Sequence, residues 1–311
     1  MSTALFLTAC SQRPVLKIAE QGSFAIGGKV LTASLGHTYH GDHAYVFFQK
    51  PVAARKYPLV FAHGVGQFSK TWETTPDGRE GFQNIFLRRG FSTYLVDQPR
   101  RGNAGRGTEP AAITPAFDEE TWFNRFRVGI WPDYFEGVQF SRDPGALDQF
   151  FRQMTPNIGP VDFEVDSDGY AALFDKVGPA VFVTHSQGGA VGWDVPADNI
   201  AAIVAIEPGG TPAIGSEQYT KLLSAGIPIA IYFGDYIDNG PEDIMSTSFW
   251  RQVRDGALAF AAQYNADGGD CTVVDLPKIG ITGNSHFMFQ ELNNKEIADH
   301  IYQWLESRAL A

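Results

Sequence analysis

The feature that most restricts the fold is a series of short apolar runs that alternate with longer stretches of helical periodicity. Gly, Pro and Asp bound these runs, and several are apolar at every position, as are strands that are covered on both faces. Such runs, joined by crossover helices, form a parallel sheet. We expect strands at residues 44–48, 59–62, 94–96, 180–183, 200–206, 227–233 and 271–276, a hairpin around 18–30, and a closing amphipathic helix over 294–305.

Composition narrows the classes of protein further. The 311 residues are 44% hydrophobic, which is enough for a large buried core. The 24 Lys and Arg against 35 Asp and Glu give a net charge of −11, so we expect no nucleic-acid partner. The two cysteines, Cys10 and Cys271, have neither metal-ligand nor disulfide-framework spacing, and no apolar stretch approaches the ~18 residues that a membrane span needs.

The chain divides into a core, an insertion and an N-terminal segment. Residues 26–102 and 179–311 carry the alternating pattern and are assigned to the core. Residues 103–178 show no clear strand but are rich in aromatic side chains, so we expect an insertion that caps one end of the sheet. Residues 1–25 form the N-terminal segment. There Leu7-Thr8-Ala9-Cys10 is similar to a lipobox, and a truncated signal would favour a periplasmic, lipid-anchored or secreted protein over a cytoplasmic one.

A candidate nucleophile follows one of the apolar runs. Val181-Phe182-Val183 leads through Thr184 and His185 to Ser186, and Gln187-Gly188-Gly189 then opens a helical stretch. This is the G-x-S-x-G turn with Thr184 in place of the first glycine. Small residues are needed on both sides of the serine because the strand and the helix approach closely there. We expect an exposed Ser186 hydroxyl, with the Gln187 N–H facing a developing oxyanion.

A second donor is expected after an earlier strand. The run 58–62 leads into His63-Gly64-Val65, a turn that leaves the N–H of Val65 free to bind the same oxyanion. His63 precedes the serine, whereas the chain order in this kind of site is serine, acid, histidine. We therefore interpret His63 as a structural residue of the turn.

The base and its acid should follow later strands. His286 lies in Gly283-Asn284-Ser285-His286-Phe287, before the closing helix, and is the expected base. Three carboxylates follow strands: Glu207 after 200–206, and Asp235 or Asp238 after 227–233. Spacing alone does not choose among them, because each could instead cap a helix.

Two further groups of polar residues have simpler explanations than a functional site. His37, His40 and His43 have metal-like spacing but lie far from the serine turn, so we expect no metal site. Arg100, Arg101, Arg125 and Arg127 could meet a substrate carboxylate or could be solvated.

Several segments together resemble the α/β-hydrolase superfamily. They are Thr71-Trp72-Glu73-Thr74-Thr75-Pro76-Asp77-Gly78-Arg79, the stretch 91–102 (FSTYLVDQPRRG), the Glu207-Pro208-Gly209-Gly210 turn, and Gly283-Asn284-Ser285-His286 followed by Asn293-Asn294. More closely, the chain is similar to bacterial serine esterases whose triad acid is a glutamate after strand six. The resemblance implies Ser186, Glu207 and His286 as the triad and Val65 and Gln187 as oxyanion donors. The described prototype has adjacent cysteines where this chain has Val65-Gly66, so the prototype's disulfide cannot form here.

The expectation is therefore an α/β-hydrolase fold, with a mostly parallel central sheet, helices on both faces and an aromatic-rich cap. The function expected is hydrolysis of a small carboxylic ester through an acyl-enzyme on Ser186, without a cofactor. Cleavage of a lactone, an amide or a C–C bond by the same triad is the alternative within this fold. A noncatalytic, hydrolase-like binding protein is the alternative from another class. The sequence does not indicate the oligomeric state.

Overall fold

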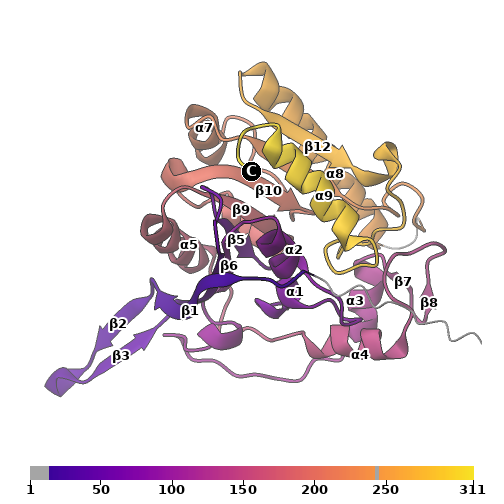
Figure 1. The fold of residues 1–311 in the computed structure, drawn as a ribbon. Coiled ribbons are helices and arrows are strands. Elements are labelled where there is room, and N and C mark those ends of the chain that lie inside the picture. Colours follow the sequence, from indigo (N-terminus) through magenta and orange to yellow (C-terminus); the bar gives the residue numbers. More distant parts are fainter. Residues whose placement is uncertain (1–13, 242–244) are drawn as a thin grey trace, which may run out of the picture.

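The computed structural model describes residues 14–241 and 245–311, which are built around an eight-stranded sheet (Figure 1). Its order is β1-β4-β6-β5-β9-β10-β11-β12; β1–β4 and β4–β6 are antiparallel, and every other pair is parallel. The mostly parallel sheet predicted from the apolar runs is thus confirmed. The strands are β1 (Ile18–Ile26), β2 (Lys29–Thr32), β3 (Thr38–Gly41), β4 (Ala44–Pro51), β5 (Leu59–Ala62), β6 (Thr93–Asp97), β7 (Gly129–Ile130), β8 (Asp133–Tyr134), β9 (Ala180–His185), β10 (Ile200–Ile206), β11 (Ile229–Phe233) and β12 (Cys271–Asp275).

Helices cover the sheet on both faces. On one face α2 packs against α9 (Figure 1). A second group contains α5, α6, α7 and α8. In this group α5 contacts α6, and α7 meets α8 through Tyr219 and Phe260. The helices are α1 (Lys70–Glu73), α2 (Phe82–Arg88), α3 (Glu119–Arg125), α4 (Pro144–Arg152), α5 (Phe163–Val177), α6 (Gln187–Gly192), α7 (Glu217–Ser224), α8 (Met245–Ala266) and α9 (Asn294–Glu306). Among the residues that the structure describes, no helix is long and apolar enough to cross a membrane.

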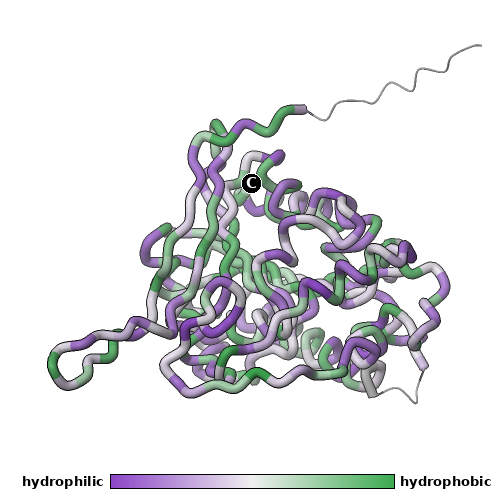
Figure 2. The backbone as a smooth tube through the Cα atoms, turned by 90° about the horizontal axis from the view of Figure 1, so that it is seen from below, coloured by the Kyte–Doolittle hydropathy of each residue, from purple (hydrophilic) through white to green (hydrophobic). Residues whose placement is uncertain are grey.

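The core lies between the sheet and these helices. Every residue of β5, β6, β9 and β11 is buried, as expected for strands that are covered on both faces. Figure 2 shows the resulting hydrophobic centre of the fold, with more hydrophilic segments around it.

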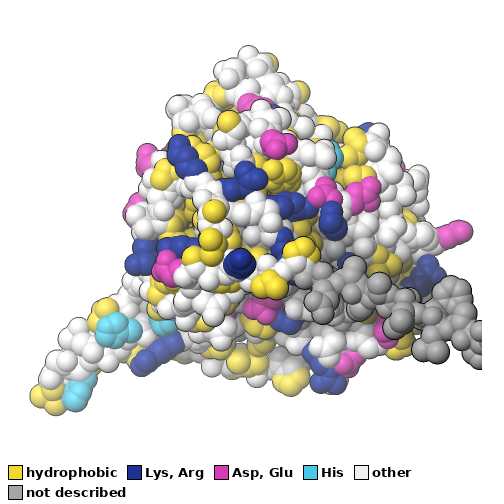
Figure 3. Space-filling model, in the orientation of Figure 1, with side chains coloured by type: hydrophobic (Ala, Val, Ile, Leu, Met, Phe, Trp, Pro, Cys, Tyr) yellow, Lys and Arg dark blue, Asp and Glu magenta, His cyan; other side chains and the backbone are white. Residues whose placement is uncertain are grey.

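The hairpin predicted around residues 18–30 is wrong, because β1 and β2 do not pair with each other. β1 pairs with β4, and β2 pairs with β3, so the two strands lie along one side of a longer ribbon. Gly27 and Gly28 join β1 to β2 with φ of 66° and 84°. At Gly28 a Cβ atom would lie 2.6 Å from the carbonyl oxygen of Gly41, so the glycine pair permits a bend and a close strand contact rather than a chain reversal. The β2–β3 end of the ribbon projects from the body, and apolar and histidine side chains are visible on it (Figure 3).

The segment between β6 and β9 has two parts. α3, β7, β8 and α4 lie together beyond one end of the sheet (Figure 1). α5 instead packs against β1, β4 and α6, so this helix lies with the core although the predicted insertion, 103–178, included it. Its register explains the placement, since Val165, Tyr170, Leu173 and Phe174 form a buried apolar stripe.

Candidate active site

Ser186 occupies the single residue between β9 and α6. It adopts φ 53° and ψ −119°, a left-handed conformation that strains a side chain other than glycine. The turn is also tight, because a Cβ at Gly188 would lie 2.5 Å from the carbonyl oxygen of His63, and one at Gly189 would lie 2.7 Å from Cβ of Pro208. These close approaches explain why the sequence has small residues after the serine.

The structure brings His286 and Glu207 together. Nδ1 of His286 lies 2.8 Å from Oε2 of Glu207, and both side chains are buried. Oε1 of Glu207 accepts a hydrogen bond of 2.7 Å from the N–H of Gly234. Nε2 of His286 is buried and has no hydrogen-bond partner among the residues described. Glu207 thus fixes the imidazole through its Nδ1 atom.

The two other candidate acids are engaged elsewhere. The carboxylate of Asp235 accepts from the N–H of Tyr236 at 2.7 Å and from the N–H of Gly283 at 2.8 Å. Asp238 pairs with Arg254 through two bonds of 2.7 Å. Of the carboxylates that spacing left open, only Glu207 contacts the histidine within the described residues.

Arg127 is a second partner of Glu207 that the sequence did not indicate. Its Nη2 forms an ion pair with Oε1 of Glu207, and its Nε donates to the carbonyl oxygen of Asp235 at 2.9 Å. No local motif announces this contact, because 80 positions separate Arg127 from Glu207. Of the arginines that were candidates for a substrate carboxylate, Arg100 instead pairs with Asp42, and Arg101 donates to the carbonyl oxygen of Gly64.

These contacts set the charges of the pair. Burial alone would raise the pKa of Glu207, but the Arg127 charge and the bond to His286 lower it to about 2. Burial and the Arg127 charge lower the pKa of His286, and Glu207 partly opposes them. At neutral pH the arrangement is therefore a carboxylate beside a neutral imidazole, which is the form of a general base. Burial, with Arg101, lowers the pKa of His63 to about 3, in keeping with a structural residue.

Val65 and Gln187 line the same pocket as Ser186. Gln187 is the first residue of α6, so its N–H has no acceptor within the helix. The Val65 turn is held by hydrogen bonds in place of a disulfide: Oε1 of Gln67 accepts from the N–H of Gly64 at 3.1 Å, and Arg101 donates to the carbonyl oxygen of Gly64 at 2.9 Å. The turn after β5 is thereby held at both the N–H and the carbonyl of Gly64.

The pocket at Ser186 has a volume of about 650 Å³. Its wall is largely aromatic, and Asp118, Thr121 and Arg125 supply polar groups. The aromatic lining residues are Trp122, Phe126, Phe163, Phe249 and Trp250. A pocket of this size and lining suits a small, partly apolar molecule.

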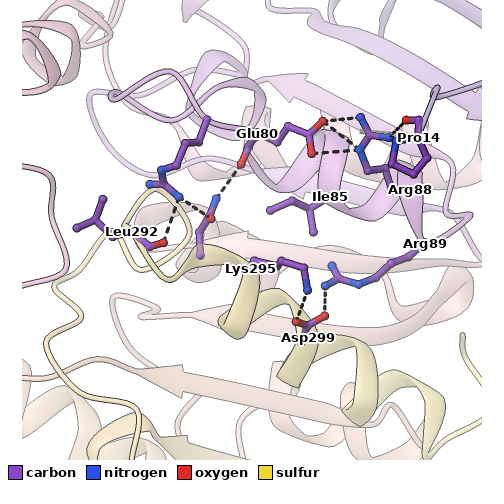
Figure 4. Close-up of a pocket in the computed structure, with 10 residues that line it drawn as sticks. Pro14, Glu80, Ile85, Arg88, Arg89, Leu292, Lys295 and Asp299 are labelled. Atoms are coloured by element: carbon purple, nitrogen blue, oxygen red, sulfur yellow. Dashed lines mark hydrogen bonds and ion pairs between the residues drawn. The ribbon is translucent and has the colours of Figure 1, made fainter. Parts of the chain in front are cut away.

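A second hollow of about 570 Å³ lies between α2 and α9. Five of its charged side chains pair with one another: Glu80 pairs with Arg88, and Asp299 pairs with both Lys295 and Arg89 (Figure 4). Arg79 pairs with Asp77 outside the hollow. It contains none of the candidate catalytic residues.

The described residues contain no cluster of three or more His, Cys, Asp or Glu side chains that could hold a metal ion. Asp42, which lies between His40 and His43 in the chain, accepts hydrogen bonds from Arg100 at 2.8 Å and from the N–H of Thr108 at 3.0 Å. The lipobox-like residues up to Cys10 lie outside the described part of the chain.

The chain is similar to known hydrolases in sequence and in structure. The sequence model of the "Alpha/beta hydrolase family" matches residues 59–278. A "Probable secreted lipase phiG" of Fungal sp. (strain ATCC 74256) is 30% identical over 302 residues, which cover 81% of this chain and 82% of the lipase. A solved structure described as that of a novel bacterial esterase is 33% identical, with a TM-score of 0.81, and the match covers 96% of this chain and 98% of the esterase.

These similarities cover most of the chain and include the strands and turns that carry Ser186, Glu207 and Val65. They decide between the two classes of function that the sequence left open, in favour of an enzyme over a noncatalytic binding protein. The chain belongs to the alpha/beta hydrolase family and is a hydrolase related to esterases and lipases.

Proposed function

We propose that this protein hydrolyses carboxylic esters through an acyl-enzyme on Ser186. The observation that carries the proposal is the buried bond of 2.8 Å between His286 Nδ1 and Glu207 Oε2, which leaves Nε2 of the imidazole without a partner among the described residues. The strained turn at Ser186 and the pocket that it shares with Val65 and Gln187 support the same assignment.

In the acylation half, Nε2 of His286 takes the proton from the Ser186 hydroxyl as Oγ attacks the ester carbonyl carbon. The carbonyl π electrons move to the oxygen, which accepts hydrogen bonds from the N–H groups of Val65 and Gln187. When the carbonyl re-forms, the bond to the alkoxy oxygen breaks, and the imidazolium gives its proton to the leaving alcohol. Glu207 holds the imidazole in the tautomer that presents Nε2 and stabilises the imidazolium.

In the deacylation half, a water molecule repeats the attack. His286 takes a proton from the water, whose oxygen bonds to the acyl carbon, and the same two N–H groups hold the oxyanion. The bond between the acyl carbon and Oγ then breaks, and Ser186 recovers a proton from the imidazolium. The acid is released, and the enzyme returns to its starting state without a cofactor.

The pocket lining favours esters with an apolar or aromatic group. Phe126 and Trp250 lie against His286 as well as in the pocket, so a substrate bound among the aromatic side chains has its carbonyl close to the base. We propose that α3, β7, β8 and α4 act as the cap of this pocket, since Trp122 and Arg125 of α3 line it. The similarity to a probable secreted lipase supports an extracytoplasmic location, which the lipobox-like residues before Cys10 also favour.

The proposal is tested with Ser186→Ala and a series of p-nitrophenyl esters of increasing acyl length. The variant should fold, because the Ser186 side chain makes no capping bond to α6, and it should lose nearly all turnover and all labelling by a fluorophosphonate probe. A folded Ser186→Ala protein with wild-type turnover would refute the serine mechanism. Turnover of a matched lactone or amide above that of every ester would retain the triad but replace the substrate class.

A further inference from the structure

We propose that Arg127 is a positioning residue of the triad, which holds the Glu207 carboxylate in the orientation that His286 requires. This inference rests on the proposed function, because it concerns how the acid of that triad is fixed. It assigns a role to a residue of the cap segment, outside the strands and turns that carry the serine, the acid and the histidine.

The contacts divide the carboxylate of Glu207 between two partners. Oε2 faces Nδ1 of His286 at 2.8 Å, whereas Oε1 accepts from Gly234 N–H at 2.7 Å and from the Arg127 guanidinium. Rotation of the carboxylate about its last bond would break the two bonds on Oε1. Arg127 therefore opposes any rotation that would withdraw Oε2 from the imidazole.

Two further contacts hold the Arg127 side chain. Its Nε donates to the carbonyl oxygen of Asp235 at 2.9 Å, and its guanidinium lies 5.3 Å from the centre of the Trp250 ring. Its backbone has φ 63° and follows the carbonyl of Phe126, which accepts from the N–H of His286 at 3.0 Å. Two consecutive residues of the cap segment thus contact the acid and the base of the triad.

Charge supplies the second part of the argument. Glu207 is fully buried, and a buried carboxylate without a cation would tend to take up a proton. The Arg127 charge lowers the pKa of Glu207 and also that of His286. Removal of this charge should therefore make the coupled pair bind a proton more readily, and the base form should be lost at a higher pH as the medium is acidified.

Other groups near His286 bear on the same titration. The His185 ring lies 4.4 Å from the His286 ring, centre to centre, and burial holds the His185 pKa well below its usual range. Glu291 binds the N–H of Ser285, and burial raises its pKa to about 7. The rings of Phe126 and Trp250, which also face the imidazole, carry no charge. Glu291 is thus the group whose titration must be separated from that of the Glu207–His286 pair.

The experiment measures kcat/KM against pH for Arg127→Met, Arg127→Lys and Arg152→Met on one p-nitrophenyl ester. Arg152 lies in the same cap segment but is exposed and pairs with Asp148, so it provides a matched control. We expect Arg127→Met to shift the acid limb of the kcat/KM profile, where activity falls at low pH, to higher pH by about one unit or more. Arg127→Lys should retain the charge and leave the limb near its wild-type position, and Arg152→Met should leave the whole profile unchanged. The shift should persist in a Glu291→Gln background.

A second comparison shows whether Arg127 acts through Glu207. In a Glu207→Gln background, Arg127→Met should have little further effect on kcat, since the group that it positions is gone. This comparison also applies if Arg127→Met alone folds poorly, because the double variant has no unpaired buried carboxylate. An unmoved acid limb in folded Arg127→Met, or an equal loss of kcat with and without Glu207, would overturn the inference. Failure of the proposed function is recognised separately, by turnover in Ser186→Ala.

Discussion

Replacement of Glu207 by Gln is the sharpest single test of the proposed triad. The amide is nearly isosteric with the carboxylate, but it has one acceptor oxygen where Glu207 uses two: one towards His286, the other towards Gly234 and Arg127. If the amide oxygen stays with Gly234 and Arg127, the NH2 group faces Nδ1 of His286 and favours the wrong tautomer. If the amide turns round, its NH2 group faces the N–H of Gly234 and the Arg127 guanidinium, neither of which can accept a hydrogen bond.

The expected loss follows from the role of the acid. Disruption of the histidine tautomer costs about 10⁴-fold in turnover in the serine-protease case, which corresponds to about 5.4 kcal/mol at the transition state. Stability should fall as well, because Arg127 is left buried beside a neutral amide, and the loss of one partner of a buried ion pair costs about 3–5 kcal/mol. Glu207→Gln should therefore show a lower melting temperature in addition to its low kcat.

The assay must separate these two effects. Turnover of a short-chain p-nitrophenyl ester is measured well below the melting temperature of the variant and is normalised to the folded fraction from circular dichroism. Asp235→Asn and Asp238→Asn are the matched controls, since their side chains bind the N–H groups of a turn and Arg254 respectively. Turnover within tenfold of wild type in folded Glu207→Gln, with a collapse in Asp235→Asn, would refute the assignment of the acid.

Two further substitutions test the turns that hold the site. Gly188→Ala would place a Cβ atom 2.5 Å from the carbonyl oxygen of His63, so we expect a lower melting temperature and a lower kcat. Its control is Gly256→Ala in α8, where a Cβ atom meets nothing within 4 Å and should stabilise the protein by about 0.5–1 kcal/mol. Equal melting temperatures for the two variants would contradict this view of the serine turn. Gln67→Ala removes the side chain that binds the N–H of Gly64, just before the proposed Val65 donor. Because complete loss of one oxyanion donor lowers kcat by about 10²–10³-fold, this variant should lower kcat by about tenfold or more, with a smaller change in KM. Gln49→Ala in β4, away from the site, is the control, and an unchanged kcat in Gln67→Ala would show that the turn does not depend on this bond.

The sheet and the approximate position of the candidate site could be predicted because both depend on local patterns. Residues that end parallel strands lie at the same edge of the sheet, so a serine after 180–183 and the carboxylates after 200–206 and 227–233 all belong to one edge. The register agrees, since His185 pairs with Ile206 across β9 and β10, immediately before Ser186 and Glu207. The choice among the three carboxylates was not available from spacing, because it depends on which side chain reaches a loop about 80 positions away.

The features that were missed depend on the direction of the chain in space. Gly27-Gly28 reads as a turn, but the sequence does not say whether such a pair reverses a strand or only bends it. Likewise, the predicted insertion, 103–178, ended too late in the chain, because its many aromatic residues gave no sign of where the chain returns to the core. The buried apolar residues of α5 follow the helical period and mark that point. Arg127 was expected to meet a substrate carboxylate or solvent, because arginines are mostly exposed, and no local pattern indicates its pairing with Glu207.

In the proposed mechanism, two aromatic residues belong both to the pocket at Ser186 and to the surroundings of the proposed base, His286. Phe126 lines the pocket and stacks on the His286 ring, with centroids 4.6 Å apart and planes at 14°, and its carbonyl accepts from the N–H of His286. Trp250 lines the pocket, lies 4.4 Å from the same ring, and donates to the carbonyl of Arg125. Trp122 and Phe163 line the pocket, and neither makes a ring contact with His286 among the described residues. If the proposed function is correct, substitutions at Trp122 or Phe163 should change substrate preference without direct effect on His286. Substitutions at Phe126 or Trp250 should instead alter the pocket and the position of His286 together.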